Sequence, residues 1–299
     1  LYNRLMSTMD EAEPALEEVS GEDGAVIVAH EILPSFLMAL KPGQARALLM
    51  DTGGRTSHVA ILARSLQIPA VSGLRNVVTA VKPDDTIIVD GSGGLVIVNP
   101  NEDDIRRFRE RVEVFERQRR ELFTMRRLEP MTRDGKYITL HANIELPTEA
   151  EKVMDYGATG VGLYRSEFLF LQYSAPTEEE QTEAYRQILE TMAPCPVTIR
   201  TLDAGGDKLV SGITATNEAN PFMGWRSIRV CLDREDIFCT QLKALLKANT
   251  KGNLRILLPM ISGLEELRRA KACIRRCSEE LEAEGIKCAT LKVGIMIEV

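Results

Sequence analysis

Short apolar runs set between polar segments predict an α/β protein. Before residue 100 the runs hold about four to six residues, which is the length of buried strands rather than of helices. These runs predict strands at residues 25–29, 45–50, 68–71, 86–90 and 95–99. Pro34 opens a predicted helix that continues to Leu40. We expect a small α/β domain at residues 25–100, preceded at residues 1–24 by a lead-in or the remnant of another domain.

A long amphipathic helix is predicted at residues 101–130, where the composition becomes highly charged. Its apolar residues recur at spacings built from three and four, at Ile105, Phe108, Val112, Phe115 and Leu122. The repeat breaks at Arg119, which favours a connector helix packed on one side over a long coiled coil. We expect this helix to tether the small domain to the rest of the chain.

Residues 131–299 alternate short apolar strands with helical segments, a pattern typical of βαβ units in a parallel sheet or barrel. The predicted strands lie at residues 138–142, 160–163, 197–199, 255–259 and 293–297. The predicted helices lie at residues 148–156, 177–192, 237–249 and 264–284. The run Gly91 to Gly94 has no following helix and no Lys-Ser or Lys-Thr pair, so we interpret it as a turn between two strands.

Three of the predicted strands are followed by a charged residue, namely Arg165, Arg200 and Glu298. In a β/α barrel the carboxyl ends of the strands meet at one mouth, where such charges converge. Arginine suits a phosphate or carboxylate, and a carboxylate such as Glu298 is a ligand for Mg²⁺. The alternative is that any strand leaving a core meets polar loop residues. With three charges, the two interpretations are about equally supported by the pattern.

Composition narrows the possible functions. The net charge is −7, and no basic stripe is interleaved with aromatic residues, so nucleic acid is not expected as a partner. No apolar run reaches the roughly eighteen residues that a membrane span needs, so we expect no membrane insertion. The first residues lack the order of a signal peptide, which predicts a cytoplasmic protein. The six cysteines form no Cys-x-x-Cys pair and are expected to be reduced.

A glycine-rich loop carries the most informative histidine. Gly53 and Gly54 permit positive φ, and Thr56 or Ser57 is positioned to cap a following helix, which places His58 in its first turn. Unpaired N–H groups at a helix start favour a neutral imidazole, which is a nucleophile, and attract anions. The flanking arginines, Arg55 and Arg64, suit a phosphate carried on the ring. A lone histidine near a helix cap is the alternative interpretation.

The string from Gly53 to Gly73 resembles the phosphohistidine loop shared by Enzyme I of the bacterial sugar phosphotransferase system, phosphoenolpyruvate (PEP) synthase and pyruvate phosphate dikinase. Three further strings, at residues 162–170, 199–208 and 220–226, look most like those of Enzyme I. The resemblance implies a small phosphohistidine swivel domain, a linker helix and the first part of a (β/α)₈ TIM barrel at residues 131–299. It also implies a homodimer in the full-length protein.

The resemblance assigns roles to individual residues. The histidine matching His58 takes a phosphoryl group from PEP and passes it to the phosphocarrier HPr. The loop around it comprises Gly53, Gly54, Arg55, Thr56, Ser57 and Arg64. The arginines matching Arg165, Arg200 and Arg226 grip PEP, Lys208 is a further contact, and the glutamate matching Glu298 binds Mg²⁺.

The chain also departs from the family pattern. The predicted barrel stops after its fifth strand, so the second metal carboxylate, further PEP contacts and the cysteine that protonates the enolate have no counterpart. We expect a fragment, which need not be active alone. Residues 33–37 lack the threonines often found in relatives. Two alternatives stay open. One is a fragment of PEP synthase or pyruvate phosphate dikinase, and the other is a phosphohistidine carrier module without turnover.

Overall fold

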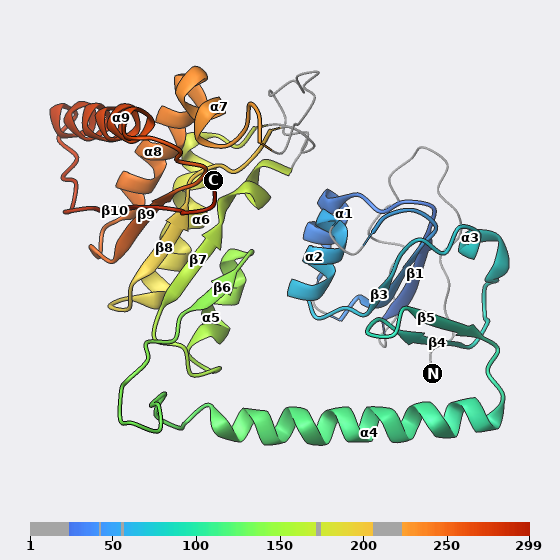
Figure 1. Ribbon diagram of the computed structural model, residues 1–299. Coiled ribbons are helices and arrows are strands. Elements are labelled where there is room, and N and C mark those ends of the chain that lie inside the picture. The colour runs from blue at the N-terminus through green and yellow to red at the C-terminus, as the bar shows by residue number, and fades with distance from the viewer. Residues whose placement is uncertain (1–23, 42, 55–56, 172–174, 206–222) are drawn as a thin grey trace. The chain divides into compact units, whose positions relative to one another are not determined.

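The computed structural model describes residues 24–41, 43–54, 57–171, 175–205 and 223–299, and at Ser35, His58 and Leu171 it describes the backbone but not the side chain. The chain divides into two compact units, Leu1–Thr124 and Met125–Val299, which we treat separately (Figure 1). In the part of the chain that is described, no helix is both long and apolar enough to span a bilayer.

The first unit is built on a parallel sheet of the order β1-β2-β3. Its strands are β1 (Ala25–Ala29), β2 (Ala45–Met50) and β3 (Ala70–Val71), and its helices are α1 (Pro34–Ala39), α2 (His58–Ser65) and α3 (Val77–Ala80). Every residue of β1 is buried, as its uniformly apolar sequence predicted. The predicted strands and the α1 helix are confirmed, whereas the short α3 helix was not predicted.

The β4 (Ile87–Asp90) and β5 (Leu95–Val98) strands form an antiparallel hairpin. The Asp90 carboxylate accepts hydrogen bonds from the N–H groups of Ser92 (3.1 Å) and Gly93 (2.9 Å), and Gly94 has φ of +64°. Because the side chain closes the turn on itself, the interpretation of the glycine run as a turn is confirmed.

The predicted connector helix is α4 (Glu102–Met125). Arg111 forms an ion pair of 2.8 Å with Asp90, and Phe108 is buried beneath the guanidinium groups of Arg107 and Arg111. The predicted packing on one side is confirmed at Phe108, which is buried, and at Ile105, which is partly buried. Further along the helix Val112, Phe115 and Leu122 are each about 60% exposed or more. The helix is therefore attached to the first unit by its first turns.

The second unit contains a five-stranded sheet of the order β10-β9-β8-β7-β6, in which every neighbouring pair is parallel (Figure 1). Its strands are β6 (Ala142–Ile144), β7 (Val161–Arg165), β8 (Val197–Arg200), β9 (Leu254–Leu258) and β10 (Lys292–Ile295). Its α-helices are α5 (Ala150–Val153), α6 (Glu178–Met192), α7 (Ile228–Asp233), α8 (Glu235–Ala248) and α9 (Leu264–Ala283). Two 3₁₀ helices are η2 (Pro147–Glu149) and η3 (Ser166–Leu171). This arrangement is that of a partial β/α barrel.

Two predictions in the second unit were wrong in detail. The first strand is at residues 142–144 rather than 138–142, because residues 131–137 close a turn and leave Ile138 and Leu140 exposed. The helix predicted at residues 148–156 is two short helices, η2 and α5. The Glu149 carboxylate bonds the N–H groups of Glu145 (2.7 Å) and Leu146 (2.8 Å), which fixes a tight first turn.

The core of the second unit lies between the sheet and its helices. Tyr164 of β7 and Tyr185 of α6 are fully buried and meet edge to face, with ring centroids 6.2 Å apart. Phe238 of α8 and Ile256 of β9 belong to the same cluster. Burial of this apolar surface stabilises the strands and keeps their ends rigid. The polar residues that follow the strands are therefore held in fixed positions.

Candidate functional site

The loop that follows β2 is held by the buried residue Asp51. Its carboxylate accepts a hydrogen bond from the N–H of Val77 at the start of α3, and its second oxygen lies 3.4 Å from Nδ1 of His30. Gly53 then has φ of +96°, as the glycine pair predicted. The loop therefore leaves the sheet in a defined direction. Arg55 and Thr56 lie outside the described residues.

Ser57 caps the α2 helix. Its Oγ accepts a hydrogen bond of 3.2 Å from the N–H of Ala60. Ser57, one of the two predicted caps, is therefore the N-cap residue of this helix. His58 is the first residue of α2, as predicted, and the helix is anchored by the fully buried Leu62. Arg64 is exposed in the last turn, about 9 Å further along the axis than His58 at 1.5 Å per residue. Its contact with a phosphate on the histidine stays a prediction.

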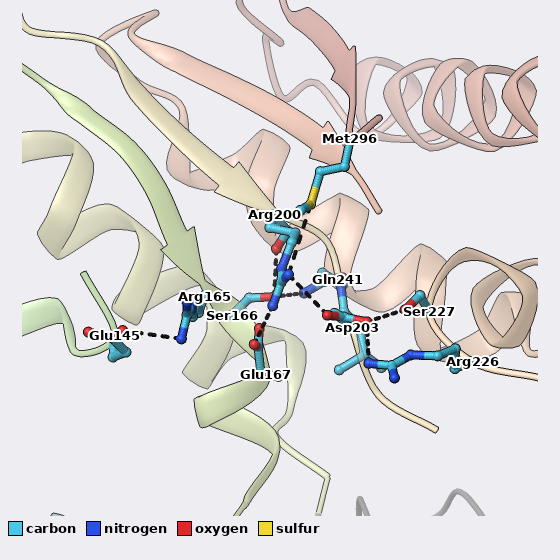
Figure 2. Close-up of polar contacts among 11 residues, drawn as sticks. Glu145, Arg165, Ser166, Glu167, Arg200, Asp203, Arg226, Ser227, Gln241 and Met296 are labelled. Atoms are coloured by element: carbon cyan, nitrogen blue, oxygen red, sulfur yellow. Dashed lines mark hydrogen bonds and ion pairs between the residues drawn. The ribbon is translucent and has the colours of Figure 1, made fainter. Parts of the chain in front are cut away.

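Two of the predicted arginines stand side by side at the carboxyl end of the second sheet. Arg165 ends β7, Arg200 ends β8, and the two are directly paired across the parallel ladder. Arg165 Nη1 lies 3.5 Å from Glu145 Oε1. Arg200 Nη2 donates to Glu167, and its Nη1 pairs with Asp203 at 3.0 Å (Figure 2). Each guanidinium is thus held in place by carboxylates.

Asp203 brings the third arginine into the group. Its Oδ1 accepts a hydrogen bond of 3.0 Å from Arg226 Nη2 and another from the Ser227 hydroxyl (Figure 2). Burial favours the neutral acid, but the charge of Arg200, the Ser227 hydrogen bond and the charge of Arg226 outweigh it and hold the pKa of Asp203 below its usual value. The ionised Asp203 therefore joins Arg200 and Arg226.

Arg226 reaches this position through a close backbone contact. Gly205 and Arg226 form an isolated antiparallel bridge, and Gly205 has φ of +126°. A Cβ atom at Gly205 would lie 2.7 Å from Arg226 Cα, so only glycine fits there. The predicted contact Lys208 lies outside the described residues.

Glu298 follows β10 and lies near the end of β9. Its Oε1 accepts a hydrogen bond of 2.8 Å from the N–H of Met260, which follows β9. Arg200 Nη1 donates a weak hydrogen bond of 3.9 Å to the sulfur of Met296. The segment after β10, which also carries Glu298, therefore contacts the arginine group. Among the described residues, no three His, Cys, Asp or Glu side chains form a ready metal cluster.

Comparison with known proteins decides the family. Residues 119–299 match the family described as "PEP-utilising enzyme, PEP-binding domain". The chain belongs to the PEP-utilising enzyme family. Residues 21–94 match the description "PEP-utilising enzyme, mobile domain". The resemblance seen in the sequence motifs is thereby confirmed at the level of the family.

Individual relatives of this PEP-utilising chain carry the name phosphoenolpyruvate-protein phosphotransferase. The Staphylococcus carnosus protein is 42% identical over 280 residues, which are 93% of this chain and 49% of that protein. The Geobacillus stearothermophilus protein is 43% identical over 92% of this chain and 48% of its own length. The chain thus spans about half the length of these curated relatives. A solution structure of Enzyme I is 44% identical over 33% of this chain and 40% of its own, with a TM-score of 0.31, too low for a comparison of folds.

Each of the three arginines has a buried N–H donor that no described residue accepts. The Nε atoms of Arg165, Arg200 and Arg226 are buried and have no hydrogen-bond partner among the described residues, and the same holds for Thr201 Oγ1. A buried donor without a partner is costly, and guanidinium N–H groups bind phosphate and carboxylate oxygens well. The group therefore combines fixed geometry with unused capacity for an anion.

Several residues that hold Arg165, Arg200 and Arg226 in place were not identified by the sequence analysis. Glu167 and Asp203 follow the strand-end arginines within three positions, and this short spacing between opposite charges was a usable signal. Ser227, next to Arg226, was a weaker one. Gln241 lies on the α8 helix, and no pattern in the sequence related it to the strand ends.

Proposed function

We propose that this chain is the part of a phosphoenolpyruvate-protein phosphotransferase that binds PEP and carries the phosphorylated histidine. Residues 25–100 form the phosphohistidine domain, residues 101–130 the linker and residues 131–299 the PEP-binding domain. The observation that carries the proposal is the carboxylate-joined group of Arg165, Arg200 and Arg226, in which each guanidinium keeps a buried donor without a described partner.

PEP suits this group because it carries a phosphate and a carboxylate on a small frame. Arg165, whose side chain is 33% exposed, is the most accessible of the three and donates to an outer oxygen of the substrate. Arg226 and Arg200 are nearly buried and donate from fixed positions, with Lys208 as a further contact. Fixed donors of this kind bind an anion without the cost of reorganisation.

Mg²⁺ is the expected cofactor, and the Glu298 carboxylate is suited to be one of its ligands. The residue is exposed at the strand ends, and its Oε1 is oriented by the Met260 N–H. Magnesium keeps several waters and needs only one or two carboxylates when a substrate phosphate completes its shell. Bound there, it would neutralise charge on the transferred phosphoryl group.

Phosphoryl transfer then uses the histidine loop. A ring nitrogen of His58 attacks the phosphorus in line, the bond from phosphorus to the enol oxygen breaks, and the enolate leaves with that electron pair. Protonation of the enolate carbon yields pyruvate. The start of α2, the Ser57 cap and the loop residues Gly53, Gly54, Arg55, Thr56 and Arg64 hold the ring and its phosphate.

The acceptor in the second step is the phosphocarrier HPr of the sugar phosphotransferase system. A nucleophile on HPr attacks the phosphorus, and the bond to the His58 nitrogen breaks, which regenerates the free histidine. We further propose that the full-length protein is a cytoplasmic homodimer. These features derive from the family resemblance of the sequence motifs.

The test uses the full-length protein with Mg²⁺ and PEP labelled in its phosphate. We expect acid-labile, base-stable label on the peptide that contains His58, release of pyruvate, and loss of label in His58→Ala. Arg165→Gln is expected to weaken PEP binding about tenfold or more in calorimetry. The matched control is Arg186→Gln, which removes an exposed arginine paired with Glu183 on α6.

Two results would reject parts of the proposal. Label in the His58→Ala variant under the same conditions would reject the histidine as the acceptor. Equal PEP affinity in Arg165→Gln and Arg186→Gln would reject the strand-end site, even if the histidine were labelled.

A further inference from the structure

A buried glutamine connects the two strand ends that carry Arg165 and Arg200. Gln241 of α8 is 1% exposed and lies beside the apolar core of the second unit. Its Nε2 donates to Ser166 Oγ (3.0 Å) and to the Tyr185 hydroxyl (3.0 Å). Its Oε1 accepts a hydrogen bond of 2.9 Å from the N–H of Leu202. Burying an amide is costly unless it is paired, so these contacts need an explanation.

The orientation of the amide follows from its partners. The Leu202 N–H can only donate, so the oxygen of the Gln241 amide must face it and the nitrogen must face the two hydroxyls. Both N–H groups of the amide are then used. The Tyr185 hydroxyl donates a hydrogen bond of 3.2 Å to Gln181 Oε1, so the hydrogen bonds run in one direction from Gln241 to Gln181.

The same network reaches the backbone of both arginines. Ser166 directly follows Arg165, and its hydroxyl donates a bond of 2.7 Å to the carbonyl oxygen of Arg200 (Figure 2). Leu202 lies two residues after Arg200 and one before Asp203. Gln241 therefore contacts the segment beyond β7 through the Ser166 hydroxyl and the segment beyond β8 through the Leu202 N–H. These two segments directly follow the paired strand-end residues Arg165 and Arg200.

We infer that Gln241 is a positioning residue for the PEP site, acting through Ser166 and Leu202 on Arg165, Arg200 and Asp203. The inference rests on the proposed function and deepens it. An apolar side chain of similar size would fill the same space in the core. The groups that require the amide are the Tyr185 hydroxyl and the two strand-end segments, so its loss acts on the site as well as on stability.

The test compares Gln241→Met with Asn253→Leu. Asn253 is also a buried amide, but it precedes β9 at the opposite end of the sheet, where its Nδ2 donates to the carbonyls of Leu189 (3.0 Å) and Cys195 (2.9 Å). Both substitutions keep side-chain volume and remove buried hydrogen bonds, so both are expected to lower the melting temperature. Only Gln241→Met is expected to weaken PEP binding, by about tenfold or more, because small displacements of binding groups are costly.

A second measurement follows the backbone directly. Hydrogen exchange of a peptide covering residues 200–205 reports the Leu202 N–H, and we expect its exchange to be about tenfold faster in Gln241→Met and unchanged in Asn253→Leu. Ser166→Ala provides a second variant in the same network if Gln241→Met does not fold. Ser166→Ala is expected to weaken PEP binding relative to Asn253→Leu, and where Gln241→Met folds, the two effects are expected to be non-additive.

The outcomes distinguish the proposed PEP-binding function from the positioning role of Gln241. If the unmodified full-length protein fails to bind PEP, the proposed function is rejected, and the exchange rates still decide whether Gln241 holds the strand-end backbone. If PEP affinity or exchange changes equally in Gln241→Met and Asn253→Leu, the positioning role is overturned and Gln241 is a stabilising core residue only.

Discussion

Asp203 and Arg226 lie 23 residues apart in the sequence and are joined by a hydrogen bond of 3.0 Å between Oδ1 and Nη2. The second oxygen of the same carboxylate pairs with Arg200 at 3.0 Å. One carboxylate thus holds two guanidinium groups that would otherwise repel each other at the strand ends. Its loss affects both the stability of the second unit and the geometry of the proposed substrate site.

Asp203→Asn is expected to destabilise the chain. The substitution keeps the shape of the side chain but removes the charge shared by two nearly buried arginines, and disrupting a buried ion pair costs roughly 3 kcal/mol. The free energy of unfolding is measured by urea denaturation. Asp236→Asn is the control, because Asp236 pairs with Arg234 on the surface and is expected to contribute little. Equal losses in the two variants would contradict the bridging role.

The same carboxylate predicts a pH dependence of stability. The pKa of Asp203 is lowered in the folded chain from its usual 3.8, so its contribution is present above pH 3.8 and is lost as the pH falls through the lower, folded pKa. The stability difference between the unmodified chain and Asp203→Asn is therefore expected to shrink on acidification below about pH 4. Urea denaturation at a series of pH values measures it. A difference that grows on acidification would show that the sign is wrong.

Ser57→Ala tests the cap of the histidine helix. The substitution removes the hydrogen bond from the Ala60 N–H to Ser57 Oγ, and loss of such a cap costs about 1 kcal/mol. Because His58 is the next residue, we also expect slower labelling of His58 by PEP. Thermal unfolding and the labelling rate are the measurements. Ser57→Asn restores a good cap and should recover most of the stability; an equally unstable Asn variant would argue against capping.

Gly205→Ala tests the close approach that positions Arg226. The new Cβ would lie 2.7 Å from Arg226 Cα and 2.7 Å from the Trp225 carbonyl oxygen, at a φ that side chains rarely adopt. We expect a loss of at least about 2 kcal/mol in the free energy of unfolding, together with weaker PEP binding. Gly263→Ala is the matched control, since a Cβ there meets nothing within 4 Å. Similar behaviour of the two variants would contradict the predicted clash.

Most strands of the second unit were predictable because each is a short apolar run followed by a polar residue, as at Val197 to Arg200. The first strand was misplaced because Ile138 and Leu140 have the same apolar character as strand residues. A run of apolar residues does not reveal whether the backbone finds a neighbouring strand. Here the turn at residues 131–137 diverts the chain, and pairing begins only at Ala142.

The sequence by itself determined most of the strands and the long helices, the place of His58 at a helix start and the arginines at the strand ends. These features depend on residues close together in the chain, where periodicity, capping and turn preferences act. The tertiary structure alone decided that Asp203 joins Arg200 to Arg226 and that Gln241 holds the backbone behind them. Asp203 and Arg226 are far apart in sequence, and the bridge between Gly205 and Arg226 brings them within hydrogen-bonding distance. Gln241 meets the strand-end segments only because α8 folds back beside them.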